Sequence, residues 1–174
     1  MTDHSSNHRY RVFMEDKIGA TFVNEMVWKT EWGNYKKDRF NPCFDRIIIY
    51  ANSDTWRFYP DRIQVPKRTA KSKGLNPSAR DTKPATAWID DITLTTVSKE
   101  RVKKADNHLV RWQKPIKLYS RIIAPFTDEG DLVLDLFAGV GSLARWCKQN
   151  NRNYIGIEND KEVFKLAEEN IKRD

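Results

Sequence analysis

Cysteine is scarce in this sequence: its 174 residues include two, Cys43 and Cys147. Two cysteines exclude the disulfide framework of a small secreted domain and any cysteine-rich zinc site. The chain also lacks an apolar run near the ~20 residues needed to cross a bilayer. Its first residues, MTDHSSNHRYR, have no apolar segment of the kind found in signal peptides. We therefore expect a cytoplasmic protein in a reducing environment.

Metal-ligand spacing is missing as well. The three histidines, His4, His8 and His108, lie far apart, which favours surface or core positions over a metal site. The pair Asp90-Asp91 leaves more than one interpretation open. It could serve in acid–base chemistry or hold a metal, or one carboxylate could orient a basic side chain while the other is solvated. We expect no resident metal.

Acidic residues are too few to balance the basic ones. The chain has 31 Lys and Arg against 24 Asp and Glu, for a formal net charge of +7. The whole surplus lies in residues 55–112, which hold 13 basic and 6 acidic side chains, while 1–54 and 113–174 are each balanced. A localised basic excess favours an acidic partner, and nucleic acid is the first candidate.

The basic stretch VPKRTAKSKGLNPSARDTKP has almost no large apolar residues, so it reads as a loop or an arm. One interpretation is a solvated insert without a partner. The other is an arm whose cations contact DNA phosphates, release counterions and position the protein without reading sequence. The candidate DNA contacts, including a small cluster ahead of the arm, are Lys36, Lys37, Arg39, Lys67, Arg68, Lys71, Lys73, Arg80 and Lys83.

Periodicity predicts the main elements. Apolar residues at helical spacing indicate an amphipathic helix over 8–18, and a short strand is expected over 24–29. The run Ile-Ile-Ile-Tyr within 45–54 suits a strand buried on both faces. Residues 86–97 are rich in β-branched and aromatic side chains, and 115–124 predicts a helix with proline in its first turn. Core packing is the default role of the tryptophans Trp28, Trp32, Trp56 and Trp112, with base stacking as the alternative.

The C-terminal third predicts a strand over 131–136, a helix over 142–149, a second strand over 153–158 and a second helix over 161–171. A glycine loop separates the first strand from the first helix. This β-α-β-α order implies a parallel sheet with helices on its faces. The expected fold class is therefore α/β, Rossmann-like. We divide the chain into 1–54, a partial sheet; 55–112, a basic insert that contacts DNA; and 113–174, a cofactor-binding β-α-β-α unit.

The loop between the first strand and helix of this unit reads Asp135-Leu-Phe-Ala-Gly139-Val-Gly141. Its glycines allow a tight turn and the close approach of a ligand. The loop has no Lys and Ser/Thr of a P-loop and departs from the dinucleotide fingerprint at Ala144. An acid, Glu158, ends the next strand, where it can accept hydrogen bonds from ribose hydroxyls. Because Asp135 suits a cationic ligand, the pattern predicts S-adenosylmethionine, against the alternative of a purely structural turn.

These motifs resemble the β-class DNA amino-methyltransferases, which methylate adenine N6 or cytosine N4. In that family a Gln-Lys-Pro segment precedes a DxFxGxG loop and a strand that ends in an acid, as they do here. ATFVNEMVWK, FDRIIIYANSD and Trp88-Ile-Asp-Asp-Ile resemble earlier segments of the family, so the likeness covers nearly the whole chain. The resemblance implies a cofactor site formed by Lys114, Pro115, Asp135, Phe137, Ala138, Gly139, Gly141, Glu158 and Asn159.

The family's catalytic tetrapeptide, [DNS]-P-P-[YFW], is not seen in this sequence. The nearest string, Asn41-Pro42-Cys43-Phe44, departs from it at Cys43 and reads more simply as a turn leading into a strand. Asn41, Pro42 and Phe44 are therefore weak catalytic candidates. The resemblance implies that the sheet lacks central strands, so either the remaining strands pair directly or another chain fills the gap. We expect a partner subunit, a homodimer or a fragment.

Three functions stay open at this point. The first is a site-specific DNA methyltransferase, or its cofactor-binding subunit, acting on a flipped base, with adenine favoured over cytosine. The second is a non-catalytic relative that binds S-adenosylmethionine and DNA and regulates or pairs with a partner. The third is an RNA-directed methyltransferase, against which the order of Gln-Lys-Pro before the glycine loop argues.

Overall fold

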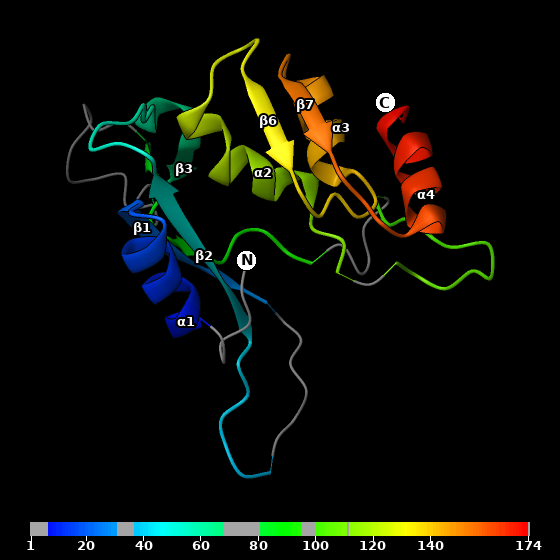
Figure 1. The fold of residues 1–174 in the computed structure, drawn as a ribbon, viewed down its shortest axis with the longest axis horizontal. Coiled ribbons are helices and arrows are strands. Elements are labelled where there is room, and N and C mark those ends of the chain that lie inside the picture. The colour runs from blue at the N-terminus through cyan, green and yellow to red at the C-terminus, as the bar shows by residue number, and fades with distance from the viewer. Residues whose placement is uncertain (1–6, 31–36, 68–80, 95–99, 111, 174) are drawn as a thin grey trace. The chain divides into compact units, whose positions relative to one another are not determined.

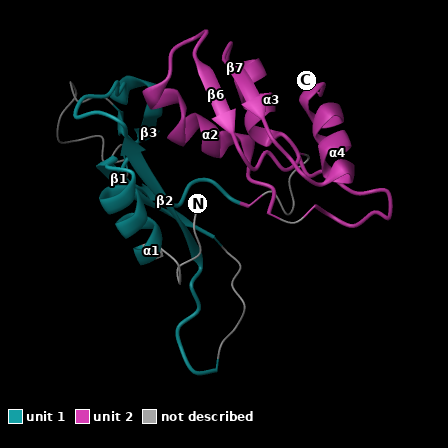
Figure 2. Cartoon of the chain, in the orientation of Figure 1, with its two compact units in different colours: residues 1–93 teal, residues 94–174 magenta. Residues whose placement is uncertain are grey.

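The computed structural model describes residues 7–30, 37–67, 81–94, 100–110 and 112–173. The chain divides into two compact units, Met1–Thr93 and Leu94–Asp174 (Figure 2). The boundary falls inside the segment 55–112 that the charge pattern assigned to a single basic insert. Each unit is described by itself below.

Unit 1 is built on an antiparallel pair of strands, β1 (Thr21–Lys29) and β2 (Phe44–Ala51) (Figure 1). A short strand, β5 (Trp88–Ile89), pairs with the other edge of β1 in parallel, so the sheet order is β2-β1-β5. The first helix, α1 (Asn7–Val12), continues into a π-helical turn, η1 (Phe13–Lys17). A 3-10 turn, η2 (Pro60–Ile63), leads into a two-stranded antiparallel ribbon of β3 (Gln64–Pro66) and β4 (Thr82–Pro84).

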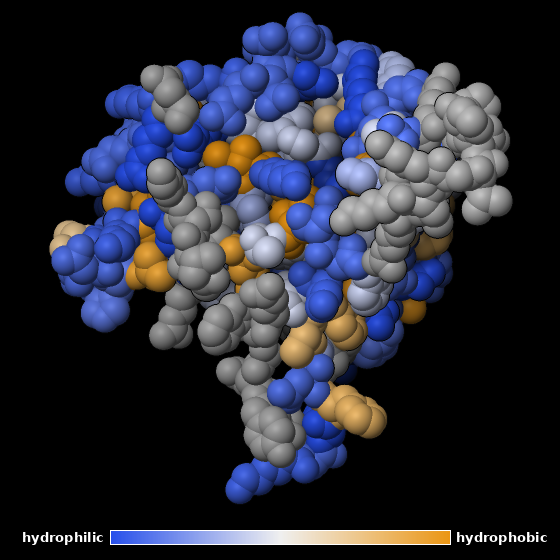
Figure 3. Space-filling model, turned by 180° about the vertical axis from the view of Figure 1, so that it is seen from behind, coloured by the Kyte–Doolittle hydropathy of each residue, from blue (hydrophilic) through white to orange (hydrophobic). Residues whose placement is uncertain are grey.

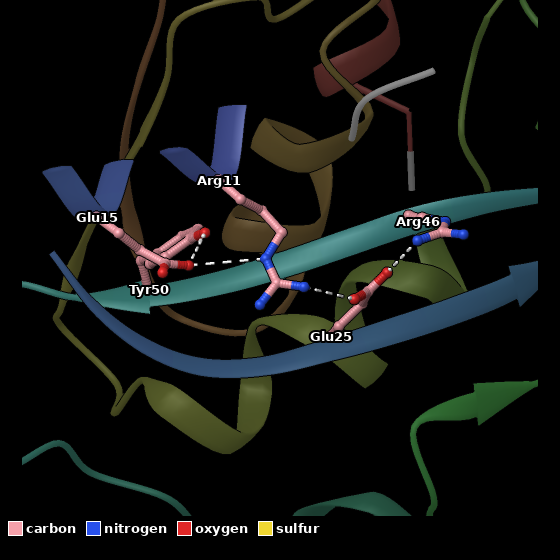
Figure 4. Close-up of polar contacts among 5 residues, drawn as sticks. All are labelled: Arg11, Glu15, Glu25, Arg46 and Tyr50. Atoms are coloured by element: carbon pink, nitrogen blue, oxygen red, sulfur yellow. Dashed lines mark hydrogen bonds and ion pairs between the residues drawn. The ribbon is translucent and has the colours of Figure 1, made fainter. Parts of the chain in front are cut away.

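Polar contacts connect the first helix to the strand pair (Figure 4). Glu25 on β1 accepts from Arg46 on β2 at 2.9 Å and from Arg11 on α1 at 3.5 Å. Arg11 also forms an ion pair with Glu15, whose carboxylate accepts a hydrogen bond from the Tyr50 hydroxyl. Each ion pair is partly exposed, so each contributes little stability alone. The chain of contacts instead sets the orientation of α1 on the strands.

Burial in unit 1 differs from expectation on β2. The Ile-Ile-Ile-Tyr run forms a strand as predicted, but it is not buried on both faces: Ile47 is buried and its neighbours are half-buried. Among the described residues β2 lies at the edge of its sheet, so fewer elements cover it. Trp28 on β1 is a core residue as expected, and its indole nitrogen donates to the Ile92 carbonyl at 2.8 Å. Trp56 and Trp112, by contrast, are exposed.

Unit 2 confirms the predicted β-α-β-α order. Strands β6 (Leu132–Asp135) and β7 (Asn153–Gly156) are parallel, with helix α3 (Ser142–Gln149) between them and α4 (Lys161–Ile171) after them. Helix α2 (Ile116–Ile122) precedes the strands and is followed by a 3-10 turn, η4 (Ala124–Phe126). The bounds of α3 and α4 are those that periodicity and turn residues predicted.

One face of the β6–β7 pair carries the core of unit 2. Val133 packs there with Leu143, Trp146 and Cys147 of α3, and side chains of α2 close the cluster. The other face is open. Leu134 and Ile155, which are partners in the strand register, are 56% and 49% exposed. Parallel strands are normally covered on both faces, so this open apolar face is an unusual feature of the described unit.

Further observations concern single segments and residues of the two units. Residues 86–97, which are rich in β-branched and aromatic side chains, form only the short strand β5 in their described part. Within the described ranges no helix meets the length and apolarity needed to span a membrane. In the same ranges no three His, Cys, Asp or Glu side chains gather as metal ligands would. Asp90 and Asp91 are both exposed, and His4 and Trp32 lie outside the described residues.

Candidate functional site

The glycine loop of unit 2 is held by backbone hydrogen bonds at both ends. The Ile157 amide donates to the Asp135 carbonyl at 2.8 Å, and the Ala138 amide returns a bond to the Ile157 carbonyl at 2.9 Å. The Gly141 amide donates to the Ala138 carbonyl at 2.9 Å, which closes the turn before α3. The loop therefore extends the pairing of β6 and β7 beyond the last strand residues.

Glu158, which lies after β7, forms a hydrogen bond to the middle of the glycine loop. Its Oε2 accepts the Gly139 amide at 2.9 Å, and its Oε1 accepts the Asp160 amide at 3.0 Å. Asp160 in turn caps α4 by accepting the amides of Glu162 and Val163. A carboxylate oxygen can accept more than one hydrogen bond. Glu158, which is only half-buried, can therefore still accept bonds from ligand hydroxyls.

The two loop glycines have positive φ for different reasons. Gly139, at φ +52°, would direct a Cβ into open space, with no atom within 4 Å. Gly141, at φ +69°, would direct a Cβ at Ile171 of α4, 3.0 Å away. Gly141 is thus required by packing against α4. Gly139 leaves an unfilled surface beside Glu158 that a ligand can occupy.

Asp135 and Phe137 occupy the entrance of the loop. The Asp135 carboxylate accepts the Phe137 amide at 3.1 Å, and the Phe137 ring is 89% exposed. A large apolar ring left in water at a loop tip is available to stack on a ligand. The charge of Asp135 also acts on Tyr119 of α2. Burial raises the pKa of the Tyr119 hydroxyl, and the negative charge of Asp135 raises it further.

The Gln-Lys-Pro segment acts through hydrogen bonds that the sequence did not reveal. The buried Gln113 side chain accepts from the Val102 amide at 2.9 Å and donates to the Glu100 carbonyl at 2.8 Å. The Glu100 carboxylate accepts the first amide of α2, that of Ile116, at 2.9 Å. Glu100 was missed because no local pattern marks a residue that caps a helix 16 positions later.

These bonds hold a hairpin against the glycine loop. Lys103 and Leu109 form its β-bridge, and Val102 and Val110 bury their side chains with Val140 of the loop. Lys104 adds an ion pair to Glu162 at the start of α4. The structure thus brings the Gln-Lys-Pro segment and the glycine loop into one unit, together with a hairpin that the charge pattern had assigned to the basic insert 55–112.

The remaining cofactor candidates lie in the same unit. Pro115 is buried at the N-cap of α2, Lys114 beside it is half-buried, and Asn159 is exposed between Glu158 and Asp160. The weak catalytic candidates Asn41, Pro42 and Phe44 belong to unit 1. There the Thr30 amide donates to the Cys43 carbonyl and Phe44 begins β2, so the string leads into a strand.

The predicted DNA contacts are described only in part. Lys37 and Arg39 are exposed, and Asp38 forms an ion pair with the Arg39 guanidinium. Lys67 follows β3, and its amide donates to the carbonyl of Asp81, the residue before β4. Lys36, Arg68, Lys71, Lys73 and Arg80 lie outside the described residues.

Comparison with known proteins decides the family. The model of the N6/N4 DNA methylase family matches residues 1–169. The chain belongs to this family. Type II methyltransferase M.HpaI of Haemophilus parainfluenzae is 31% identical over 163 residues, which are 93% of this chain and 48% of that protein. Type II methyltransferase M.HindIII of Haemophilus influenzae is 27% identical over 182 residues, covering 92% of this chain and 58% of that protein.

Solved structures show the same methylase fold. The complex of M1.HpyAVI with S-adenosylmethionine matches 99% of this chain and 72% of its own, with a TM-score of 0.67 and 20% identity. The cytosine-N4-specific PvuII DNA methyltransferase matches 97% of this chain and 57% of its own, with a TM-score of 0.69 and 16% identity. The expected α/β methyltransferase fold is confirmed. This DNA methylase family member spans about half the length of the curated relatives it matches.

Proposed function

We propose that this chain binds S-adenosylmethionine and forms the cofactor-binding part of a DNA methyltransferase that acts on an exocyclic amino group. The observation that carries the proposal is the bond from the Gly139 amide to Glu158. It places a carboxylate beside a glycine whose Cβ direction is empty. That arrangement leaves room for a nucleoside and puts an acceptor next to it.

The residues present fit this cofactor. Glu158 accepts the ribose hydroxyls with lone pairs that its two backbone bonds leave available. Asp135 supplies negative charge toward a cationic ligand, and the exposed Phe137 ring supplies a stacking surface. When bound, S-adenosylmethionine supplies an electrophilic methyl group carried on a sulfonium. The protein's part is to hold and orient the reacting groups, which lowers the entropic cost of reaction.

The cofactor test is a calorimetric titration of S-adenosylmethionine into wild-type protein, Asp135→Ala and Asp131→Ala. Asp131 precedes β6, at the opposite end of the strand, and accepts the Asp128 amide at 2.9 Å. We expect Asp135→Ala to abolish binding with an unchanged circular dichroism spectrum, and Asp131→Ala to bind as wild type. Equal affinity of all three proteins would contradict the site.

For the substrate we propose duplex DNA, with adenine favoured over cytosine. The basic excess of residues 55–112 supports it, since phosphate contacts give a salt-dependent affinity. The paired charge-reversal variant Lys37→Glu with Lys67→Glu should weaken duplex binding and reduce the salt slope by about two. Binding that depends neither on salt nor on these lysines would contradict this assignment.

The cytoplasm is the proposed location of the protein.

We also propose that a second polypeptide completes the enzyme. It would carry the part of the methyltransferase domain that this chain's match to its relatives leaves uncovered. The open faces support this partner. Leu132, Leu134, Ile155 and Ile157 are all exposed along β6 and β7, and among described residues β6 pairs only with β7. In unit 1 the apolar side of the first helix is also exposed, at Tyr10, Phe13 and Ile18. Hydrophobic residues likewise reach the surface in Figure 3.

The test uses labelled methyl transfer from S-adenosylmethionine to mixed-sequence duplex DNA. We expect no incorporation by this chain alone, and incorporation once a separately purified chain that carries a D-P-P-Y tetrapeptide is added. Leu134→Glu on the open face should prevent the gain, whereas Phe164→Glu on α4 should not. Methyl transfer by the chain alone would contradict the need for a partner. It would also make Asn41, Pro42 and Phe44 the first catalytic candidates to test by mutation.

A further inference from the structure

Asn170 is a polar side chain in the core of unit 2. It lies near the end of α4, is 1% exposed, and its Nδ2 donates to the Val140 carbonyl at 2.7 Å. Its Oδ1 is buried without a hydrogen-bond partner among the described residues. Burying an amide costs free energy, and an oxygen left without a hydrogen bond adds to that cost. An apolar side chain at this position would avoid the cost. We therefore ask what the hydrogen bond from Asn170 to Val140 contributes to function.

The Val140 carbonyl lies between the two glycines of the loop. It belongs to the peptide that joins Val140 to Gly141, and Gly139 lies on the other side. Because Val140 has a glycine on each side, the backbone here has more conformational freedom than other neighbouring residues would allow. Glu158 restrains the loop through the Gly139 amide, and Asn170 restrains it through the Val140 carbonyl. Two side chains thus fix the peptides on either side of the one that joins Gly139 to Val140.

We propose that Asn170 is a positioning residue for the cofactor loop. The inference rests on the proposed binding of S-adenosylmethionine. Asn170 touches no cofactor in this role; it holds Val140 and thereby keeps the Gly139 surface in its binding conformation. Without the bond the loop populates other conformations, and the apparent affinity falls by the fraction that remains competent. The cost of the buried amide is offset by this preorganisation.

The first experiment compares Asn170→Asp and Asn170→Leu with wild type by calorimetric titration of S-adenosylmethionine at several pH values. An aspartate carboxylate cannot donate to the Val140 carbonyl, but the protonated acid can. Burial raises the pKa of a carboxyl group, so protonation is within reach of mildly acidic buffers. Relative to wild type at each pH, we expect Asn170→Asp to bind roughly tenfold more weakly at pH 8 and to recover near pH 5.5. Asn170→Leu should stay weak throughout.

Trp146→Phe serves as the matched control. It removes another hydrogen bond in unit 2, from the Trp146 indole nitrogen to Ser120 Oγ at 2.8 Å, without touching the loop. It should lower the melting temperature about as much as Asn170→Leu and leave cofactor affinity within about twofold. If Asn170→Leu and Trp146→Phe both melt earlier and both bind as wild type does, Asn170 is only structural and the proposal is overturned.

A second readout does not depend on the cofactor. Hydrogen exchange of the Gly139 and Gly141 amides, which donate to Glu158 and Ala138, reports loop order directly. Asn170→Leu should speed exchange at both amides at least tenfold, and Trp146→Phe should not. A wild-type protein that binds no S-adenosylmethionine would defeat the proposed function, while the exchange rates would still decide whether Asn170 orders the loop. Unchanged exchange in Asn170→Leu would overturn the inference by itself.

Discussion

The Gly139 amide donates to Glu158 at 2.9 Å, which joins the middle of the glycine loop to the second residue after β7. The two residues are 19 positions apart in sequence and meet because β6 and β7 are parallel neighbours. Parallel pairing brings the carboxyl ends of both strands, and the loops after them, to the same edge of the sheet. The candidate cofactor site is a direct product of this pairing.

Replacing Glu158 tests the consequence of that bond. Glu158→Ala removes the acceptor of two backbone amides and of the proposed ribose contact, so S-adenosylmethionine affinity should fall roughly ten- to a hundredfold. This corresponds to about 1.5–3 kcal/mol for hydrogen bonds to a charged group. Glu158→Gln keeps one acceptor oxygen and should lose less. Calorimetry gives both values, and an Ala variant that binds as tightly as the Gln variant would contradict the role of the acceptor.

The two loop glycines should separate stability from binding. Gly141→Ala combines positive φ with a Cβ at 3.0 Å from Ile171, so it should destabilise the protein by about 2–5 kcal/mol. Gly139→Ala has the strain but no clash, so it should cost only about 1–2 kcal/mol. Its methyl group occupies the surface proposed for the cofactor and should weaken binding. Denaturant unfolding and cofactor titration check the pair, and the reverse order of stabilities would show that the packing against α4 is wrong.

Replacing Trp112 by glycine should stabilise the protein. Its φ is +68°, and its side chain is 84% exposed. Glycine removes a backbone strain of roughly 1–2 kcal/mol and loses little packing, although it gains about 0.5–1 kcal/mol of unfolded-state entropy. Trp112→Gly should therefore raise the melting temperature by about 1–4 °C. Trp56→Gly, at an exposed tryptophan whose φ is not positive, should not raise it.

The two cysteines should differ in reactivity. Burial raises the pKa of the Cys147 thiol to about 11, and the side chain is inaccessible, whereas Cys43 is half-buried. Because the thiolate is the nucleophile, Ellman's reagent at pH 8 should modify Cys43 first and Cys147 only after unfolding in guanidinium. At pH values below 9.0, the ordinary pKa of a cysteine thiol, the neutral Cys147 thiol contributes fully to the free energy of unfolding. This contribution declines as the pH rises toward 11, the raised pKa of Cys147 in the folded protein. Rapid labelling of two thiols in the native protein would be inconsistent with this burial.

Local sequence was enough to predict the elements of unit 2. The bounds of α3 and α4 follow from apolar periodicity, from Gly141 before α3 and from the Asp160 cap before α4. The positions of Asp135 at the end of β6, and of Gly139 and Glu158 in the segments after β6 and β7, follow in the same way. Family membership could be predicted because these motifs occur in a fixed order, and the match over residues 1–169 confirms it.

Contacts between distant residues could not be predicted. Gln113 bonding to Val102 and Glu100, and Asn170 bonding to Val140, join residues from 11 to 30 positions apart with no periodic pattern. The half-buried state of β2 was missed because an apolar run looks the same at the edge of a sheet as at its centre. Burial depends on which elements pack alongside.

The amino-acid sequence by itself determined the charge distribution, the order of strands and helices in unit 2, and the chemistry available at the loop. These properties depend on side-chain type and on short-range spacing, which a linear chain already contains. Only the tertiary structure decided that Glu158 accepts the Gly139 amide, that a Cβ at Gly141 would meet Ile171, and that Asn170 donates to the Val140 carbonyl. Each of these contacts exists because parallel strand pairing and helix packing bring together backbone and side-chain groups that local sequence preferences leave apart.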